Sequence, residues 1–199
     1  MNLANWLTLF RVVLVPFFLV FMSVSVIPDR FLWALIIFII ASITDMLDGK
    51  IARKYDMVTD FGKFLDPLAD KILVAAALIC FVELGWTSAW VVALIMTREF
   101  AVSGVRLAAS TSEKKTVISA NIWGKLKTAF TMIAIIVIML MYILNDFGVI
   151  CDIGADISDS FAFPIVIISD VLMYITLLLT LISGIKYVYD YRECIDHRK

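Results

Sequence analysis

Long uncharged stretches recur along the chain and constrain its fold more than any other feature. Residues 12–28 contain no charged side chain, and residues 128–145 form a second such stretch. A helix needs about 20 apolar residues to cross a bilayer, and only helices or closed barrels satisfy their backbone hydrogen bonds there. Hydrophobic residues make up 62% of the 199 positions, above the roughly 45–50% of soluble domains. The sequence therefore predicts an all-α integral membrane protein.

The apolar stretches and the polar turns between them predict one domain over residues 1–199 with six transmembrane helices. No internal repeat or low-complexity linker divides the chain. The apolar side chains between Leu3 and Phe10 recur at helical spacing and predict a short amphipathic helix at the membrane interface, before the first span. The predicted spans are 12–28, 31–53, 64–83, 89–110, 126–145 and 163–189.

Basic residues fall almost entirely on one side of this topology. With the N-terminus inside, 16 of the 17 Lys and Arg residues lie in inner segments, and only Arg30 lies outside. The loop after the fifth predicted span carries four aspartates between Asp146 and Asp159 and no basic residue. The positive-inside rule then predicts a multi-pass protein of the cell membrane with both termini in the cytoplasm. The net charge of −1 identifies no partner, and no nucleic-acid partner is expected.

Four aspartates interrupt the apolar pattern where the second predicted span ends and the third begins. One Asp at the centre of a membrane helix costs about 2.5–3.5 kcal/mol, so four are expected only where water or cations reach them. Asp45 and Asp48 share a helix face, as do Asp66 and Asp70. Carboxylates suit one or two hard divalent cations, and Mg²⁺ combines a few of them with substrate phosphates. The pattern predicts a cytoplasmic metal and phosphate site, although a plain cap or ion pair is the alternative for any single aspartate.

Small and basic residues accompany these carboxylates. Gly49 and Ala52 lie near the face of Asp45 and Asp48 and remove side-chain bulk where a ligand must approach the helix closely. Arg53, about one turn nearer the cytoplasm, offers a planar guanidinium that can bind phosphate oxygens in a bidentate manner.

This arrangement resembles the signature of the CDP-alcohol phosphotransferase family, and the resemblance extends over nearly the whole chain. Members of that family are six-helix membrane enzymes that transfer a phosphatidyl or similar group from a CDP-linked donor to an alcohol and release CMP. The positions that match the signature are Asp45, Asp48, Gly49, Ala52, Arg53, Gly62, Asp66 and Asp70.

The resemblance also implies roles for individual residues. The four aspartates would hold divalent cations, Mg²⁺ or Mn²⁺ and two in number, which in turn hold the donor pyrophosphate. Asp70 would be the base that deprotonates the acceptor hydroxyl. A homodimer is implied as well. The nucleotide and pyrophosphate site is implied for Asn5, Thr8, Gly49, Ala52, Arg53 and Gly62.

The acceptor has to be inferred from residues outside the signature. Several cations in the inner half of the fourth predicted span and at the start of the fifth predict a phosphorylated acceptor in the same cavity as the aspartates. For each cation alone, a side chain that reaches the lipid headgroups is the alternative. These stretches resemble the family members that join CDP-diacylglycerol and sn-glycerol 3-phosphate to give phosphatidylglycerophosphate and CMP. The expected acceptor-phosphate residues are Arg98, Arg106, Lys125, Lys127 and Thr128.

Two positions depart from those members: Ala4 stands where they often have Pro, and Thr131 where they often have Gln. Another acceptor, such as inositol phosphate or a phospholipid, is therefore a second hypothesis. A cation-binding transporter is a third, which the absence of paired repeats and broken helices disfavours. Asp170 is an acid inside the sixth predicted span, and we expect it to have a packing role near the outer end.

Overall fold

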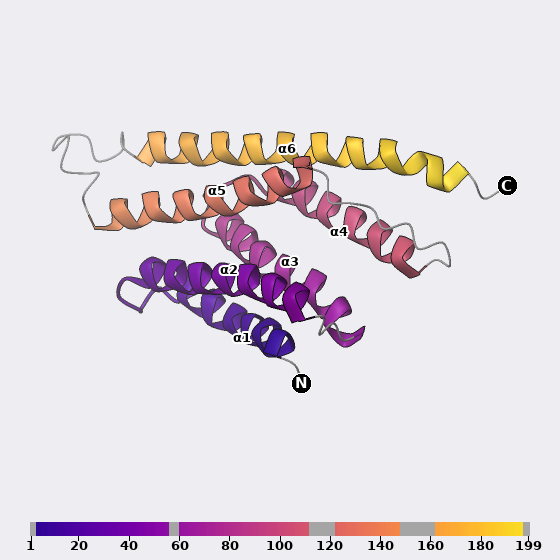
Figure 1. Ribbon diagram of the computed structural model, residues 1–199. Helices are drawn as coiled ribbons and strands as arrows, with labels where there is room; N and C mark the ends of the chain where they lie inside the picture. The colour runs from indigo at the N-terminus through magenta and orange to yellow at the C-terminus, as the bar shows by residue number, and fades with distance from the viewer. Residues whose placement is uncertain (1–2, 56–59, 112–121, 148–161, 197–199) are drawn as a thin grey trace.

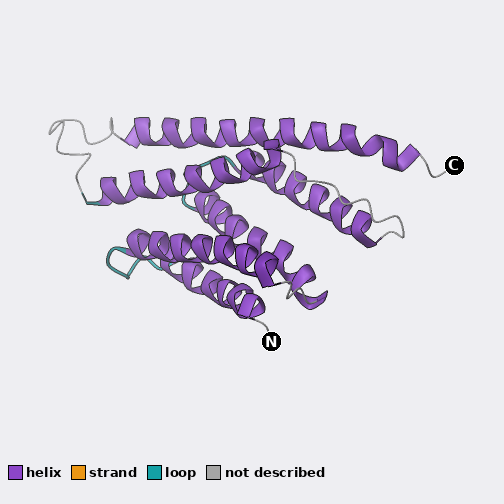
Figure 2. Cartoon of the chain, in the orientation of Figure 1, coloured by secondary structure: helices purple, strands orange, loops and turns teal. Residues whose placement is uncertain are grey.

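The computed structural model describes residues 3–55, 60–111, 122–147 and 162–196, with side chains for 6–44, 69, 71–104, 124–147 and 165–187. Every regular element in these ranges is an α-helix (Figures 1 and 2), which confirms the predicted all-α fold. The helices are α1 (Leu3–Ser23), α2 (Arg30–Tyr55), α3 (Asp60–Glu83), α4 (Ala89–Thr111), α5 (Ile122–Asp146) and α6 (Ala162–Asp196).

Short described turns connect α1 to α2 and α3 to α4. Asp29 adopts a φ of 52° before α2, a conformation that Asp tolerates better than most residues. Gly85 ends α3 with a φ of 72°. Its N–H donates to Val82 O (3.1 Å) and the next N–H, of Trp86, donates to Phe81 O (2.8 Å). These two bonds are those of a Schellman cap, which ends α3 in the gap expected between the spans predicted at 64–83 and 89–110.

The helices form two antiparallel pairs with two helices between them. In Figure 1, α1 and α2 lie below, α5 and α6 lie above, and α3 and α4 cross between the pairs. Helix α1 packs on α2 and α3, α6 packs on α4 and α5, and α2 contacts α5. Large apolar side chains fill the interior, and their burial is the main stabilising term of such contacts. Fully buried examples are Phe18, Phe38, Leu73, Phe81, Ile95, Ile135 and Met139.

The two ends of the bundle differ in chemistry. In Figure 1 the start of α1, the end of α2 and the end of α6 are the right-hand ends of those helices, and the aspartate stretch begins in the last turns of α2. An aromatic cluster links the helices near the opposite end. The rings of Trp86 and Tyr142 stack at 3.8 Å, and Phe31 and Phe81 lie 5.0 and 5.2 Å from Trp86.

Helix α1 differs from the prediction. A separate interfacial helix followed by a span over 12–28 was expected, but one continuous helix runs from Leu3 to Ser23 and ends five residues earlier. Helix elongation is cheap once a helix has started, and the polar residues Thr8 and Arg11 are buried in the bundle instead of lying at an interface. Helix α6 is also longer than its predicted span, because it continues through the charged tail to Asp196.

Three of the helices contain segments long and apolar enough to cross a membrane, within the described residues: Trp6–Ser23, Gly124–Asp146 and Ile165–Tyr187. Helix α2 has a shorter apolar segment, Arg30–Thr44. Large apolar side chains are exposed on the outside of the bundle, as expected where lipid is the solvent. The chain is thus a helical integral membrane protein, and the six-span topology stays a prediction.

Candidate active site

The signature residues fall on two helices at one end of the bundle. Asp45, Asp48, Gly49, Ala52 and Arg53 belong to the last three turns of α2, and Gly62, Asp66 and Asp70 belong to the first half of α3. The aspartates, Gly49, Ala52 and Arg53 lie within the helices predicted for them, whereas Gly62, expected before the third span, lies inside α3. Their side chains lie outside the described residues, as do those of Asn5 and Arg106. Among the side chains that are described, no three His, Cys, Asp or Glu residues come together, so the metal cluster stays a prediction.

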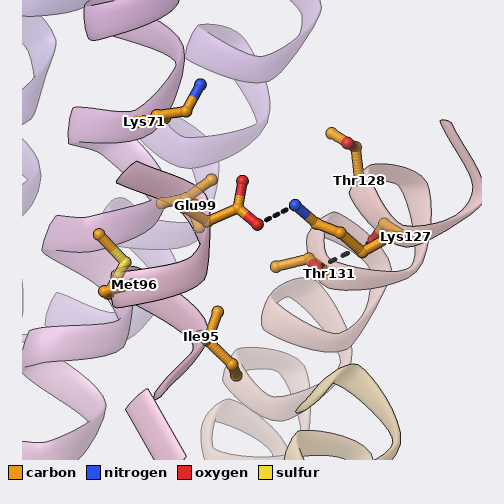
Figure 3. A pocket seen from close by; sticks show the side chains of 8 residues that line it. Lys71, Ile95, Met96, Glu99, Lys127, Thr128 and Thr131 are labelled. Carbon is orange, nitrogen blue, oxygen red and sulfur yellow. Dashed lines mark hydrogen bonds and ion pairs between the residues drawn. The ribbon is translucent and has the colours of Figure 1, made fainter. Parts of the chain in front are cut away.

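A pocket lies beside this stretch, between α3, α4 and α5 (Figure 3). It begins one residue after the signature, because Lys71 follows Asp70 directly in α3. Apolar side chains form one part of its wall and charged or hydroxyl side chains form the other. The lining residues are Lys71, Val74, Ile95, Met96, Glu99, Lys127, Thr128 and Thr131.

Charged groups from different helices meet in this pocket. Lys127 of α5 forms an ion pair with Glu99 Oε1 of α4, and Arg98 Nη1 lies 3.3 Å from the same oxygen. The Lys127 side chain is only 7% exposed, and those of Arg98 and Glu99 are 13% and 18% exposed. Figure 3 shows Lys71 and Lys127 on either side of the Glu99 carboxylate. Two cations thus share one carboxylate and Lys71 lines the same pocket, a set of groups that suits an anionic ligand.

Arg98 lies against α6 as well as against Glu99. Its Nη2 donates to Ser183 Oγ at 2.9 Å, and its side chain crosses Gly184 so closely that an added Cβ there would lie 3.0 Å from Nε. Arg98 does not line the pocket with the residues named above. The guanidinium is therefore held in position by α6. It does not line the pocket itself, but it contacts Glu99, which does.

Two threonines complete the α5 side of the pocket. The Thr131 hydroxyl is buried and donates to Lys127 O at 2.9 Å, and the Thr128 hydroxyl donates to Gly124 O at 2.9 Å. Lys125 is exposed and is not among the lining residues. Of the acceptor residues predicted from sequence and described here, Lys127 and Thr128 line the pocket, Arg98 adjoins it, and Lys125 does not.

Sequence reasoning missed two pocket residues, Lys71 and Glu99. Lys71 was counted among the inner basic residues and considered only as an ordinary ion-pair partner of Asp70, although its position next to Asp70 places it at the end of the signature. Glu99 had a stronger signal, since an acid inside an apolar helix is a functional candidate by default.

Comparison with known proteins identifies the family of the chain. The family model for CDP-alcohol phosphatidyltransferase matches residues 1–182. A Bacillus subtilis CDP-diacylglycerol--glycerol-3-phosphate 3-phosphatidyltransferase is 47% identical over 70% of this chain and 77% of its own. A Haemophilus influenzae protein of the same name is 36% identical over 94% of this chain and 91% of its own. A probable phosphatidylglycerophosphate synthase of Mycobacterium tuberculosis is 39% identical over 94% and 80%. The chain belongs to the CDP-alcohol phosphatidyltransferase family.

Proposed function

We propose that the protein transfers the phosphatidyl group of CDP-diacylglycerol to sn-glycerol 3-phosphate, giving phosphatidylglycerophosphate and CMP. The observation that carries the choice of acceptor is the pocket with Lys71 and Lys127 directly beside the end of the signature. A neutral alcohol would not need several cations, whereas a phosphate monoester gains charge-assisted hydrogen bonds from them. The names of the relatives from Bacillus subtilis and Haemophilus influenzae state the same acceptor.

The donor side of the site is proposed to lie on the start of α1, the end of α2 and the first half of α3. Divalent cations are general in this family, and we propose two Mg²⁺ or Mn²⁺ ions held by Asp45, Asp48, Asp66 and Asp70. When bound, such ions neutralise pyrophosphate charge and orient the leaving group. The other proposed residues of the nucleotide and pyrophosphate site are Asn5, Thr8, Gly49, Ala52, Arg53 and Gly62.

The chemical step needs a base and a fixed acceptor. Asp70 takes the proton of an acceptor hydroxyl, whose oxygen forms a bond to the phosphorus that carries diacylglycerol, and the bond from that phosphorus to CMP breaks. Lys127 and Thr128 hold the acceptor phosphate, with Arg98 and Arg106 as further proposed contacts, whereas the exposed Lys125 lies outside the pocket. Because Asp70 and Lys71 are neighbours in α3, one helix fixes the base relative to the acceptor pocket, which is the positioning that such reactions require.

We further propose six spans, a cytoplasmic active site in the cell membrane and a homodimer. The supporting observation for the orientation is the excess of basic residues in the predicted inner segments. A cytoplasmic pocket admits soluble glycerol 3-phosphate, while the lipid donor enters from the bilayer.

The deciding experiment is CMP release from CDP-diacylglycerol by the purified protein in detergent. Release should require both glycerol 3-phosphate and a divalent cation and should stop with EDTA. The same assay with inositol phosphate, or with a phospholipid, in place of glycerol 3-phosphate tests the other acceptors. Faster release with either of those would replace the proposed acceptor, and no release with any alcohol would remove the proposed reaction.

A further inference from the structure

The pocket holds one acid that the proposed reaction does not use. Glu99 comes from α4, and its Oε1 atom is shared by Lys127 of α5 and Arg98 of α4. Its side chain is 18% exposed, so little water competes for these contacts. In the proposed reaction Lys127 binds the acceptor phosphate, yet in this structure its ammonium group is already paired with a carboxylate.

We propose that Glu99 occupies the place of the acceptor phosphate on Lys127 and is displaced when the acceptor binds. This inference rests on the proposed function, because it assigns the pocket to the acceptor phosphate. A phosphate monoester dianion carries more charge and more acceptor oxygens than a carboxylate, so it can replace Glu99 where a weaker anion cannot. Glu99 is then a specificity-determining residue, because an anion binds only if it interacts with Lys127 more strongly than the Glu99 carboxylate does.

Arg98 gives the displaced carboxylate a second partner. Its Nη1 already lies 3.3 Å from Glu99 Oε1, and its Nη2 is fixed by Ser183 of α6 at 2.9 Å. The guanidinium has donors enough for both contacts. Glu99 can therefore leave Lys127 without becoming an unpaired buried charge, which would otherwise be costly. The exchange moves one carboxylate between two cations that already contact it.

Removing the Glu99 charge should strengthen anion binding. In wild type an incoming phosphate must separate Lys127 from Glu99 and then lie near the displaced carboxylate. In Glu99→Gln neither cost remains, so Kd for inorganic phosphate should fall by roughly tenfold, a change typical of one hydrogen bond to a charged group. The KM for glycerol 3-phosphate should fall by a similar factor. If Glu99 only held Lys127 in place, the same substitution would raise both constants.

The test is calorimetric titration of the purified full chain in detergent with inorganic phosphate, alongside CMP release with glycerol 3-phosphate. Glu83→Gln is the matched control, because Glu83 is an exposed carboxylate at the far end of α3 and its loss changes the net charge equally. In a Lys127→Gln background, Glu99→Gln should lower the phosphate Kd by less than it does in wild type, because there is no ion pair to separate. An unchanged or higher Kd in Glu99→Gln, or equal tightening by Glu83→Gln, overturns the proposal.

A further variant keeps the test valid if Glu99→Gln does not fold. Glu99→Asp retains the charge but shortens the side chain, which weakens its hold on Lys127, so the phosphate Kd should fall about two- to threefold. No fall in the Kd of a folded Glu99→Asp protein overturns the exchange. The two assays separate the two proposals: CMP release tests the reaction, and the phosphate titration tests the exchange even if glycerol 3-phosphate proves not to be the acceptor.

Discussion

Arg98 of α4 crosses Gly184 of α6 at a distance that leaves no room for a side chain, since an added Cβ would lie 3.0 Å from Nε and 3.2 Å from Cγ. The same guanidinium bonds Ser183 and Glu99. The contact between α4 and α6 thus fixes the Arg98 guanidinium beside the acceptor pocket.

Gly184→Ala should displace Arg98 and weaken its contact with Glu99. The Arg98 side chain is flexible and can shift by a few tenths of an ångström, so we expect a rise in KM for glycerol 3-phosphate of about two- to fivefold, the effect of one weakened hydrogen bond. The control is Gly104→Ala in α4, where nothing lies within 4 Å of an added Cβ. Steady-state CMP release measures both variants. Equal KM values for Gly184→Ala and wild type would show that the position of Arg98 does not influence the acceptor.

Lys127→Gln should weaken acceptor binding and leave donor binding nearly unchanged. Loss of a charge-assisted bond to phosphate corresponds to roughly 10–100-fold in KM for glycerol 3-phosphate. Lys125→Gln is the matched control, because Lys125 is two residues away on α5, is exposed and does not line the pocket. A larger effect at Lys125 than at Lys127 would contradict the assignment of the pocket to the acceptor.

Asp70→Asn should remove the proposed base without unfolding the protein. General-base catalysis contributes about 10²–10⁴-fold, so kcat for CMP release should fall by that factor. Asp146→Asn serves as the control, because Asp146 is an exposed residue at the end of α5. Gel filtration in detergent checks that the Asp70→Asn protein remains folded. Undiminished turnover by that protein would exclude Asp70 as the base.

Trp86→Ala should reduce stability and leave the acceptor KM unchanged. Trp86 is 5% exposed and its ring stacks on Tyr142, so truncation removes buried contacts worth about 3–5 kcal/mol. The aromatic cluster lies away from the acceptor pocket, which is why binding should not change. Thermal unfolding in detergent measures the loss, with Trp90→Ala as control because Trp90 is 54% exposed. A smaller drop in Tm for Trp86→Ala than for Trp90→Ala would contradict this.

The sequence was sufficient for the helical fold because bilayer-length apolar stretches and turn residues act locally. The Schellman cap at Gly85 and the placement of the aspartate stretch at the junction of α2 and α3 follow from such local patterns. The predicted boundaries of the first helix were wrong because local signals there did not decide the outcome. Pro16 lies inside α1 without ending it, as transmembrane helices tolerate, and amphipathic spacing could not distinguish burial in the bundle from contact with an interface.

The candidate site was predictable in part for the same reason. The signature has fixed spacing on two consecutive helices, whereas the acceptor pocket combines residues far apart in the chain. Glu99 and Lys127 are 28 positions apart and Arg98 and Ser183 are 85 apart. Periodicity along one helix does not report such pairs, so Lys127 was predicted as a phosphate ligand but its partner Glu99 was not. The same limit applies to Arg98, whose position depends on a glycine in α6.

The charged pocket draws its groups from α3, α4 and α5, and α6 fixes one of them. A chain whose helices have entered the bilayer without packing together therefore has no acceptor site at all. Insertion of the helices would therefore not be enough to form this pocket, because the helices must also pack together. A ligand that binds only the packed state adds to its stability by mass action, so glycerol 3-phosphate should act as a chemical chaperone during assembly.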